Sequence, residues 1–168
     1  TATLMIASTI ILERISFRSS TGAIKYSIDT VSILEEQNNI MKISGWAFST
    51  TNPGEPTDNY KTEVILFSNT SNYLFETKPK IREDVVNAFS ESEWDIVLPG
   101  FNAYINKEDL SQGDYCIALK LSDEQNKKIE FVNTKKVLSN KANEIFLQEE
   151  PDPQCEIFYQ TYLEQPAN

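Results

Sequence analysis

The residues best able to do chemistry in this 168-residue chain are its carboxylates and its two cysteines, because the sequence contains no histidine. Histidine-based triads, histidine metal sites and histidine pH switches are therefore excluded. Two cysteines are too few for a four-cysteine zinc site. No phosphate-binding loop, dinucleotide-binding fingerprint, nucleophile elbow or zinc-protease helix occurs. We expect a chain that is not an enzyme and holds no metal or cofactor.

Two acidic groups have residue types that a site would need. The first is Glu91, Glu93 and Asp95 beside Trp94, and the second is Glu55, Asp58 and Asn59. A pair of carboxylates suffices for glycoside hydrolysis, but nothing in the sequence places two of the first group across a cleft. The oxygens of the second group suit Ca²⁺, although their spacing does not match an EF-hand loop. Solvated loops explain both groups more simply.

The charge balance also restricts function. The chain has 15 Lys and Arg against 25 Asp and Glu, for a net charge of −10, so a polyanionic nucleic acid would be repelled. Five of the acidic residues fall within residues 149–168, which contain no Lys or Arg but several large apolar side chains. A purely solvated tail would not need those apolar side chains. We expect this tail to dock on its own domain or on a partner.

The first twelve residues are mostly apolar and carry no charged side chain, but a bilayer span needs roughly 18–20 apolar residues. This segment is either the outer end of a membrane anchor or the first element of the core. We divide the chain into this N-terminal segment (1–22), a β-domain (23–140) and the acidic aromatic tail (141–168).

The β-domain consists of short segments of alternating polarity, which predict half-buried strands. We expect strands in 24–28, 40–48, 64–67, 73–77, 94–98, 101–105, 115–121, 128–132 and 135–138. One short helix is expected over 82–89, where Val85, Val86 and Phe89 share a face. Many short strands with almost no helix indicate an antiparallel immunoglobulin-like or jelly-roll-like β-sandwich.

The alternation also assigns faces to individual side chains. If Tyr115 and Ile117 point inward, Cys116 points outward, and the tail that carries Cys155 can cross that outer face. A disulfide there would close a loop of about 40 residues and stabilise the fold by roughly 3–4 kcal/mol. Two free thiols remain the alternative, and a thiol count under denaturing conditions decides between them.

The same argument gives candidate ligand-binding residues. If Phe101 and Ala103 face inward, Asn102 and Tyr104 face outward, where an aromatic ring and an amide suit sugar recognition. Tyr60, expected in a loop, and Tyr73, at the loop end of the strand expected over 73–77, are weaker candidates.

Four motifs follow one another in the β-domain: Ile43-Ser-Gly-Trp-Ala-Phe48, Arg82-Glu-Asp-Val85, Gly100-Phe101 and Leu110-Ser-Gln-Gly-Asp-Tyr115. In this order they resemble the accessory β-sandwich modules of bacterial, mainly Gram-positive, cell-envelope proteins. Those modules accompany surface-polysaccharide glycosyltransferases and multi-span membrane proteins. The resemblance covers about residues 24–138, and it implies a setting and a fold more than a mechanism.

Most of these motif residues have a structural interpretation. Gly45 lets a bulky neighbour approach the backbone, and we expect Trp46 to fill the space between the sheets. We expect Asp84 to cap the helix and Arg82 to pair with a carboxylate or cover an aromatic face. Gly100, next to Phe101, and Gly113 are expected in turns, and Tyr115 begins its strand like a tyrosine corner.

Two functional hypotheses follow. The first is a non-catalytic, extracytoplasmic module that binds envelope glycans at the cell surface or beside the membrane. The second is a structural or protein-interaction domain that self-associates or binds a partner through the N-terminal segment or the tail.

Overall fold

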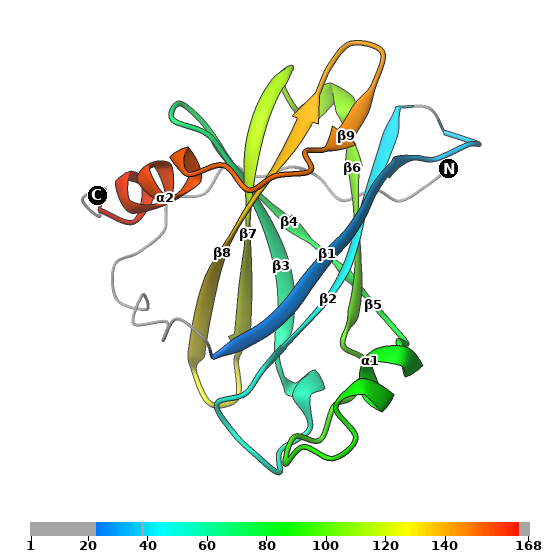
Figure 1. Ribbon diagram of the computed structural model, residues 1–168, viewed down its shortest axis with the longest axis vertical. Helices are drawn as coiled ribbons and strands as arrows, with labels where there is room; N and C mark the ends of the chain where they lie inside the picture. The colour runs from blue at the N-terminus through cyan, green and yellow to red at the C-terminus, as the bar shows by residue number, and fades with distance from the viewer. Residues whose placement is uncertain (1–22, 38, 165–168) are drawn as a thin grey trace.

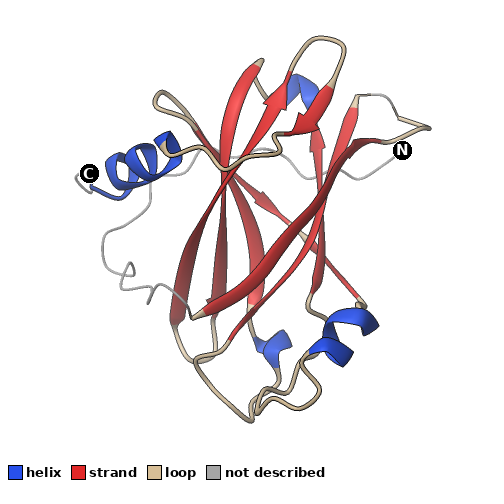
Figure 2. Cartoon of the chain, in the orientation of Figure 1, coloured by secondary structure: helices blue, strands red, loops and turns tan. Residues whose placement is uncertain are grey.

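The computed structural model describes residues 23–37 and 39–164, with side chains described as far as Thr161. They form two antiparallel sheets (Figures 1 and 2). Sheet A has the strand order β1–β2–β6–β5, and sheet B has the order β4–β3–β7–β8–β9. The predicted all-β antiparallel sandwich is confirmed.

Sheet A consists of β1 (Ile24–Ile33), β2 (Ile40–Ser49), β5 (Lys78–Lys80) and β6 (Gly100–Asn106). Sheet B consists of β3 (Lys61–Phe67), β4 (Asn72–Glu76), β7 (Gly113–Asp123), β8 (Lys128–Asn140) and β9 (Ile145–Leu147). The helical elements are η2 (Thr57–Asn59), α1 (Glu83–Ala88), η3 (Lys107–Asp109) and α2 (Gln154–Glu164). The helix expected over 82–89 is present as α1.

The main core lies between the two sheets and is made by alternate side chains of their strands. On β6, Phe101, Ala103 and Ile105 are buried in this core, as their alternation predicts. On β7, the buried residues Ile117 and Leu119 face them from sheet B. Burial of apolar surface contributes about 25 cal/mol per Å² and is the main force that holds the two sheets together.

The chain passes from sheet B to sheet A at Thr77, the single residue between β4 and β5. Thr77 Oγ1 donates a 2.6 Å hydrogen bond to the carbonyl of Thr62 on β3, which holds this crossing point. The following strand, β5, was not expected from the sequence. It is a short edge strand in which Pro79, which has no N–H, pairs with Phe101.

The strand expected over 94–98 does not exist. This segment makes only an isolated bridge between Asp95 and Pro56, and Leu98 adopts a positive φ of 46°. Thr57 Oγ1 donates to the carbonyl of Val97 and accepts from its N–H, at 3.1 and 2.8 Å. The alternation was misleading because Ile96 is buried against α1 rather than within a sheet.

Other strands also have different bounds from those expected: β1, expected over 24–28, continues to Ile33, and β3, expected over 64–67, begins at Lys61. The predicted strands 128–132 and 135–138 are one strand, β8, whose pairing with β7 shifts between Cys116 and Ala118. The extra residues of this bulge include Lys135, which has a φ of 61°. The polar residues at the bulge, 133–136, interrupt the alternation of apolar side chains along β8. Strand β9 was also not expected.

Trp46 does not lie between the sheets, contrary to the sequence-based expectation. Because Ala47 faces the main core, Trp46 and Phe48 project from the opposite, outer face of sheet A. There they form an aromatic cluster with Phe89 and Trp94, in which the Phe48 ring centroid lies 5.3 Å from that of Phe89 and 5.7 Å from that of Trp94. The cluster joins α1 to the sheet.

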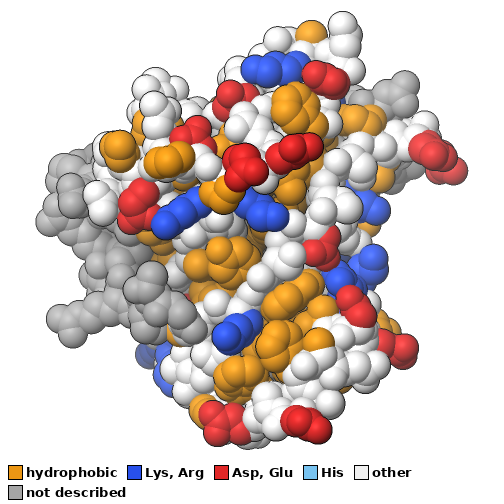
Figure 3. All heavy atoms as spheres, in the orientation of Figure 1, with side chains coloured by type: hydrophobic (Ala, Val, Ile, Leu, Met, Phe, Trp, Pro, Cys, Tyr) orange, Lys and Arg blue, Asp and Glu red, His pale blue; other side chains and the backbone are white. Residues whose placement is uncertain are grey.

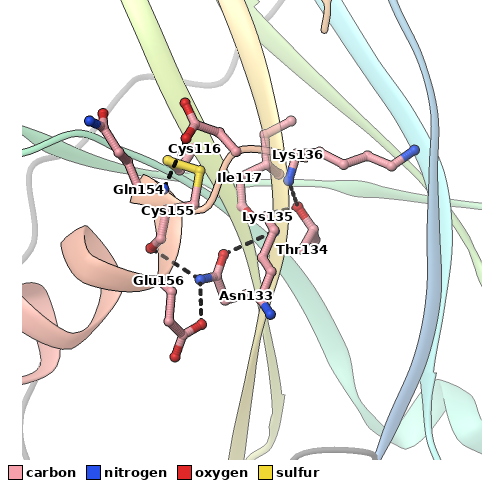
Figure 4. Close-up of a disulfide and its surroundings, with 10 residues drawn as sticks. Cys116, Ile117, Asn133, Thr134, Lys135, Lys136, Gln154, Cys155 and Glu156 are labelled. Atoms are coloured by element: carbon pink, nitrogen blue, oxygen red, sulfur yellow. Dashed lines mark hydrogen bonds between the residues drawn. A yellow bond between two sulfur atoms is a disulfide. The ribbon is translucent and has the colours of Figure 1, made fainter. Parts of the chain in front are cut away.

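The tail docks on its own domain. Cys116, on the outer face of β7, forms a disulfide with Cys155, and their Cα atoms are 5.6 Å apart (Figure 4). Cys155 lies in the first turn of α2, an unpredicted helix that lies on the side of β7 and β8 away from β1 (Figure 1). Phe158 and Tyr159 pack there on an apolar surface of sheet B. Asn133 also donates to the carbonyl of Cys155 at 3.1 Å.

Gly45 and Tyr115 have the structural roles expected of them. A Cβ on Gly45 would collide with the carbonyl of Ser27 and lie 3.0 Å from the Phe101 ring, so only glycine fits between these neighbours. The Tyr115 hydroxyl donates a 2.8 Å hydrogen bond to the carbonyl of Ser111, as in a tyrosine corner.

Candidate functional site

The outer face of sheet A holds the candidate binding residues Asn102 and Tyr104. Both project outward from β6 because their neighbours Phe101, Ala103 and Ile105 are buried in the core. The sequence prediction for the direction of these two side chains is therefore confirmed by the strand's burial pattern. Each is partly buried rather than freely exposed.

Residues from the two neighbouring strands complete this surface. Lys42 and Ser44 on β2 lie opposite Tyr104 and Asn102, and Lys78 on β5 lies opposite Asn102 from the other side. We call these five residues, Lys42, Ser44, Lys78, Asn102 and Tyr104, the Tyr104 surface.

Hydrogen bonds fix the polar groups of the Tyr104 surface. Ser44 Oγ donates to Asn102 Oδ1 at 2.7 Å, and Asn102 Nδ2 donates to the Tyr104 hydroxyl at 3.4 Å. The Lys78 ammonium lies 5.8 Å from the centroid of the Tyr104 ring. An aromatic ring, an amide, a hydroxyl and ammonium groups thus lie together on a rigid sheet. Such a set can stack against a sugar ring and hydrogen-bond to its hydroxyls.

The sequence alone did not identify Lys42, Ser44 or Lys78 as part of this surface. The alternation of β2, with Met41 and Ile43 inside, is a signal that Lys42 and Ser44 point outward. However, their register against β6, and the existence of β5, depend on pairing between segments far apart in the sequence.

Tyr60 and Tyr73 do not join the Tyr104 surface. Tyr60 lines a pocket of about 270 Å³ near Thr77 and Pro79, where burial raises the pKa of Tyr60 to about 12. The negative charge of Glu130 acts in the same direction. Tyr73 packs edge to face on Tyr115, with ring centroids 5.9 Å apart, and belongs to the margin of the main core. Both rings therefore pack against the main core, away from the Tyr104 surface.

Arg82 fastens α1 to sheet A. Its Nη1 makes a 2.7 Å ion pair with Asp29 on β1, while Nε and Nη2 donate to both oxygens of Asp84 at 2.8 and 2.7 Å. These bonds lower the pKa of Asp84 to about 2. Asp84 was expected to cap the helix, but α1 has no side-chain cap at its N-terminus and Asp84 binds Arg82 instead.

Gly100 lies at the start of β6 beside this ion pair, not in a turn as expected. A Cβ there would lie 2.6 Å from both Arg82 Cγ and the carbonyl of Lys80. Glycine is therefore required because the chain of β5 and Arg82 passes close to it. Gly113, also expected in a turn, begins β7 with a φ of 148° that favours glycine.

A groove of about 450 Å³ lies beside α1, and Arg82 is one of the residues that line it. Its apolar lining includes Ile81, Val86 and Leu98, which are exposed by 70%, 37% and 40%. The aromatic cluster nearby is also only partly covered, and Figure 3 shows apolar side chains at the surface over the lower parts of β1 and β2. This groove was not anticipated from the sequence because it depends on the loop conformation around Leu98.

The acidic groups considered as sites do not converge. Glu91, Glu93 and Asp95 are all exposed, and so are Glu55 and Asp58. Within the described part of the chain, no group of three or more acidic or cysteine side chains is arranged to hold a metal ion. Their placement agrees with solvated loops.

Comparison with known proteins found no matching family model, no matching curated protein and no matching solved structure. The resemblance to accessory cell-envelope modules stays a prediction. None of the helices in residues 23–37 and 39–164 combines the length and apolar character needed to cross a membrane. The expected N-terminal anchor or core element lies outside the described residues.

Proposed function

We propose that this chain is a non-catalytic, extracytoplasmic module of a bacterial cell-envelope protein that binds surface glycans through the Tyr104 surface. The observation that carries the proposal is the joint placement of the Tyr104 ring and the Asn102 amide on one outer sheet face, with Ser44 bonded to that amide. Sugars are recognised by stacking on aromatic rings and by a few well-placed hydrogen bonds.

The disulfide supports the extracytoplasmic part of the proposal. Cys116 and Cys155 are bonded, and both cysteines of the chain are used in this bond. Structural disulfides persist in oxidising compartments and are rare in the bacterial cytosol. The disulfide between α2 and sheet B is therefore consistent with a location outside the cytosol, at the cell surface.

Replacement of Tyr104 by alanine tests the proposal. We expect Tyr104→Ala to weaken binding to envelope glycans at least tenfold, which corresponds to about 1.4 kcal/mol. Binding is measured on an array of bacterial envelope glycans and by affinity electrophoresis, with folding checked by circular dichroism.

Phe146→Ala is the matched control, because Phe146 is a partly exposed ring on β9 in the other sheet. This control should bind as the wild type does. A correctly folded wild-type protein that binds no envelope glycan would contradict the proposal.

A second candidate is a structural or protein-interaction domain of a surface assembly. It is favoured by the groove beside α1, since Ile81, Val86 and Leu98 are three of the five large apolar side chains that are exposed in the described part of the chain. Exposed apolar groups that gather in one place are typical of interaction sites. We expect concentration-dependent self-association in sedimentation velocity that Val86→Asp abolishes, and a wild type that stays monomeric at high concentration would exclude it.

A further inference from the structure

We infer that the glycan bound by the Tyr104 surface is an anionic polymer, an inference that rests on the proposed function. Its starting point is an uneven distribution of charge. The four strands of sheet A carry four lysines and one aspartate, whereas the strands of sheet B carry five lysines and five acidic residues. A chain with a net charge of −10 therefore has one sheet with a positive balance.

All four lysines of sheet A are on its outer face. Lys42 is paired with Tyr104 and Lys78 with Asn102. Lys80 is paired with Gly100, and Lys25 with the outward residue Phe48. The only acidic residue on the strands of sheet A, Asp29, is paired with Arg82, which also binds Asp84.

None of these four lysines forms an ion pair with a carboxylate of the described residues. Two of them lie near aromatic rings instead, Lys78 near Tyr104 and Lys25 at 6.0 Å from the Trp94 ring centroid. On sheet B the situation differs, since Lys61 and Lys120 are ion-paired with glutamates. The ammonium groups of sheet A thus keep their charge available to a ligand.

The arrangement around Tyr104 defines what such a ligand needs. Strand β6 lies between β2 and β5, so Lys42 and Lys78 flank the Tyr104 row from opposite sides. Neighbouring strands are about 4.8 Å apart, which places the two cations within reach of substituents on a sugar stacked on the ring. Ammonium groups attract carboxylate, phosphate or sulfate, and a positive face on an acidic protein steers such polymers to that face.

The test uses polymer pairs that differ only in their acidic group. The pairs are polygalacturonate and its methyl ester for carboxylate, phosphorylated mannan and mannan for phosphate, and dextran sulfate and dextran for sulfate. We expect the full chain to bind at least one acidic polymer at least tenfold more tightly than its neutral partner. We also expect this preference to fall as salt rises from 50 to 500 mM, because screening weakens exposed charges.

The double variant Lys42→Gln/Lys78→Gln should lose most of the preference for the acidic polymer over its neutral partner. The matched control is Lys135→Gln/Lys141→Gln, which removes two exposed lysines at β8 of sheet B and its following loop and should retain the preference. Equal loss in both double variants would show attraction by overall charge and would overturn the inference. Stronger binding to anionic lipid vesicles than to all three acidic polymers would also overturn it.

The result separates the inference from the proposed function. Equal binding to the acidic and neutral member of each pair would overturn the anionic ligand and leave glycan binding in place. Binding to none of the six polymers and to no glycan of the envelope array would reject both.

Discussion

A few side-chain hydrogen bonds hold the connection between β6 and β7, residues 107–112, in which the chain passes from sheet A to sheet B. The carbonyl of Ser111 accepts hydrogen bonds from the Tyr115 hydroxyl at 2.8 Å and from Asn140 Nδ2 at 3.1 Å. Asn140 also donates to the carbonyl of Leu110 at 3.2 Å. These bonds satisfy backbone groups that no strand partner reaches, and so they fix where β7 begins.

Tyr115→Phe should therefore lower the free energy of unfolding by about 1 kcal/mol, the usual net contribution of one hydrogen bond. The measurement is urea unfolding followed by circular dichroism. Tyr26→Phe is the control, because Tyr26 packs on the same core but its hydroxyl makes no hydrogen bond in the described part of the chain. If both variants lost the same stability, the Tyr115 bond would have no special role.

The ion pair of Arg82 predicts a pH dependence. The carboxyl of Asp84 has an ordinary pKa of 3.8, which the hydrogen bonds from Arg82 lower to about 2 in the folded protein. Between these values the unfolded chain binds more protons, so stability falls as the pH falls.

We expect wild type to be more stable than Asp84→Asn above pH 4, with a difference that shrinks steadily as the pH falls from 4 towards 2. Urea unfolding at several pH values between 7 and 2 measures it. A difference between wild type and Asp84→Asn that stays constant over this range would show that Arg82 does not stabilise the ionised Asp84.

At the scale of elements, α2 depends on a covalent bond as well as on packing. Burial beside sheet B raises the pKa of Tyr159, whose ring centroid lies 5.8 Å from that of Phe67. Ile157, in contrast, is 61% exposed. Eleven residues are too few for a stable isolated helix in water, so α2 needs the sheet and the disulfide.

Reduction of the disulfide should lower the free energy of unfolding by roughly 4 kcal/mol, because it frees a loop closed over 39 residues. We also expect faster proteolytic cleavage within α2, which would no longer be tethered. The measurements are urea unfolding and limited proteolysis with and without reductant.

The control is Cys116→Ala/Cys155→Ala, whose stability should not respond to reductant. If thiol titration showed two free thiols in reduced wild type while its stability and cleavage rate stayed unchanged, the proposed dependence of α2 on the bond would be wrong.

At the scale of the whole molecule, the apolar residues form three separate groups rather than one core. The main core lies between the sheets, a second group lies under α2, and the third is the aromatic cluster under α1. Both tryptophans of the chain, Trp46 and Trp94, belong to the third group. Tryptophan fluorescence therefore reports on α1 and its surroundings, and not on the space between the sheets.

We expect fluorescence and far-ultraviolet circular dichroism to give the same unfolding midpoint. Phe48 is fully buried on a strand that also lines the main core, and Arg82 ties α1 to β1, so the cluster cannot open without disturbing sheet A. Coincident curves indicate two-state unfolding. An earlier fluorescence transition would instead show that α1 detaches first.

The sequence by itself determined the elements whose side chains alternate strictly. The faces of β6 and β7, the outward direction of Cys116 and Tyr104, and the antiparallel sandwich follow from period-two burial, which is a local property of an extended chain. The close approach at Gly45 and the corner at Tyr115 were also accessible from local spacing.

Only the tertiary structure decided which residues each of these side chains contacts. Trp46 and Ile96 carry apolar side chains in strand-like patterns, yet both pack under α1, because a sheet has two faces and either can be covered. The register that brings Lys42 and Lys78 to Tyr104 depends on strands distant in sequence, and so does the covering of sheet B by α2. Local pattern fixes the direction of a side chain, but its partner is fixed by how the sheets and helices pack.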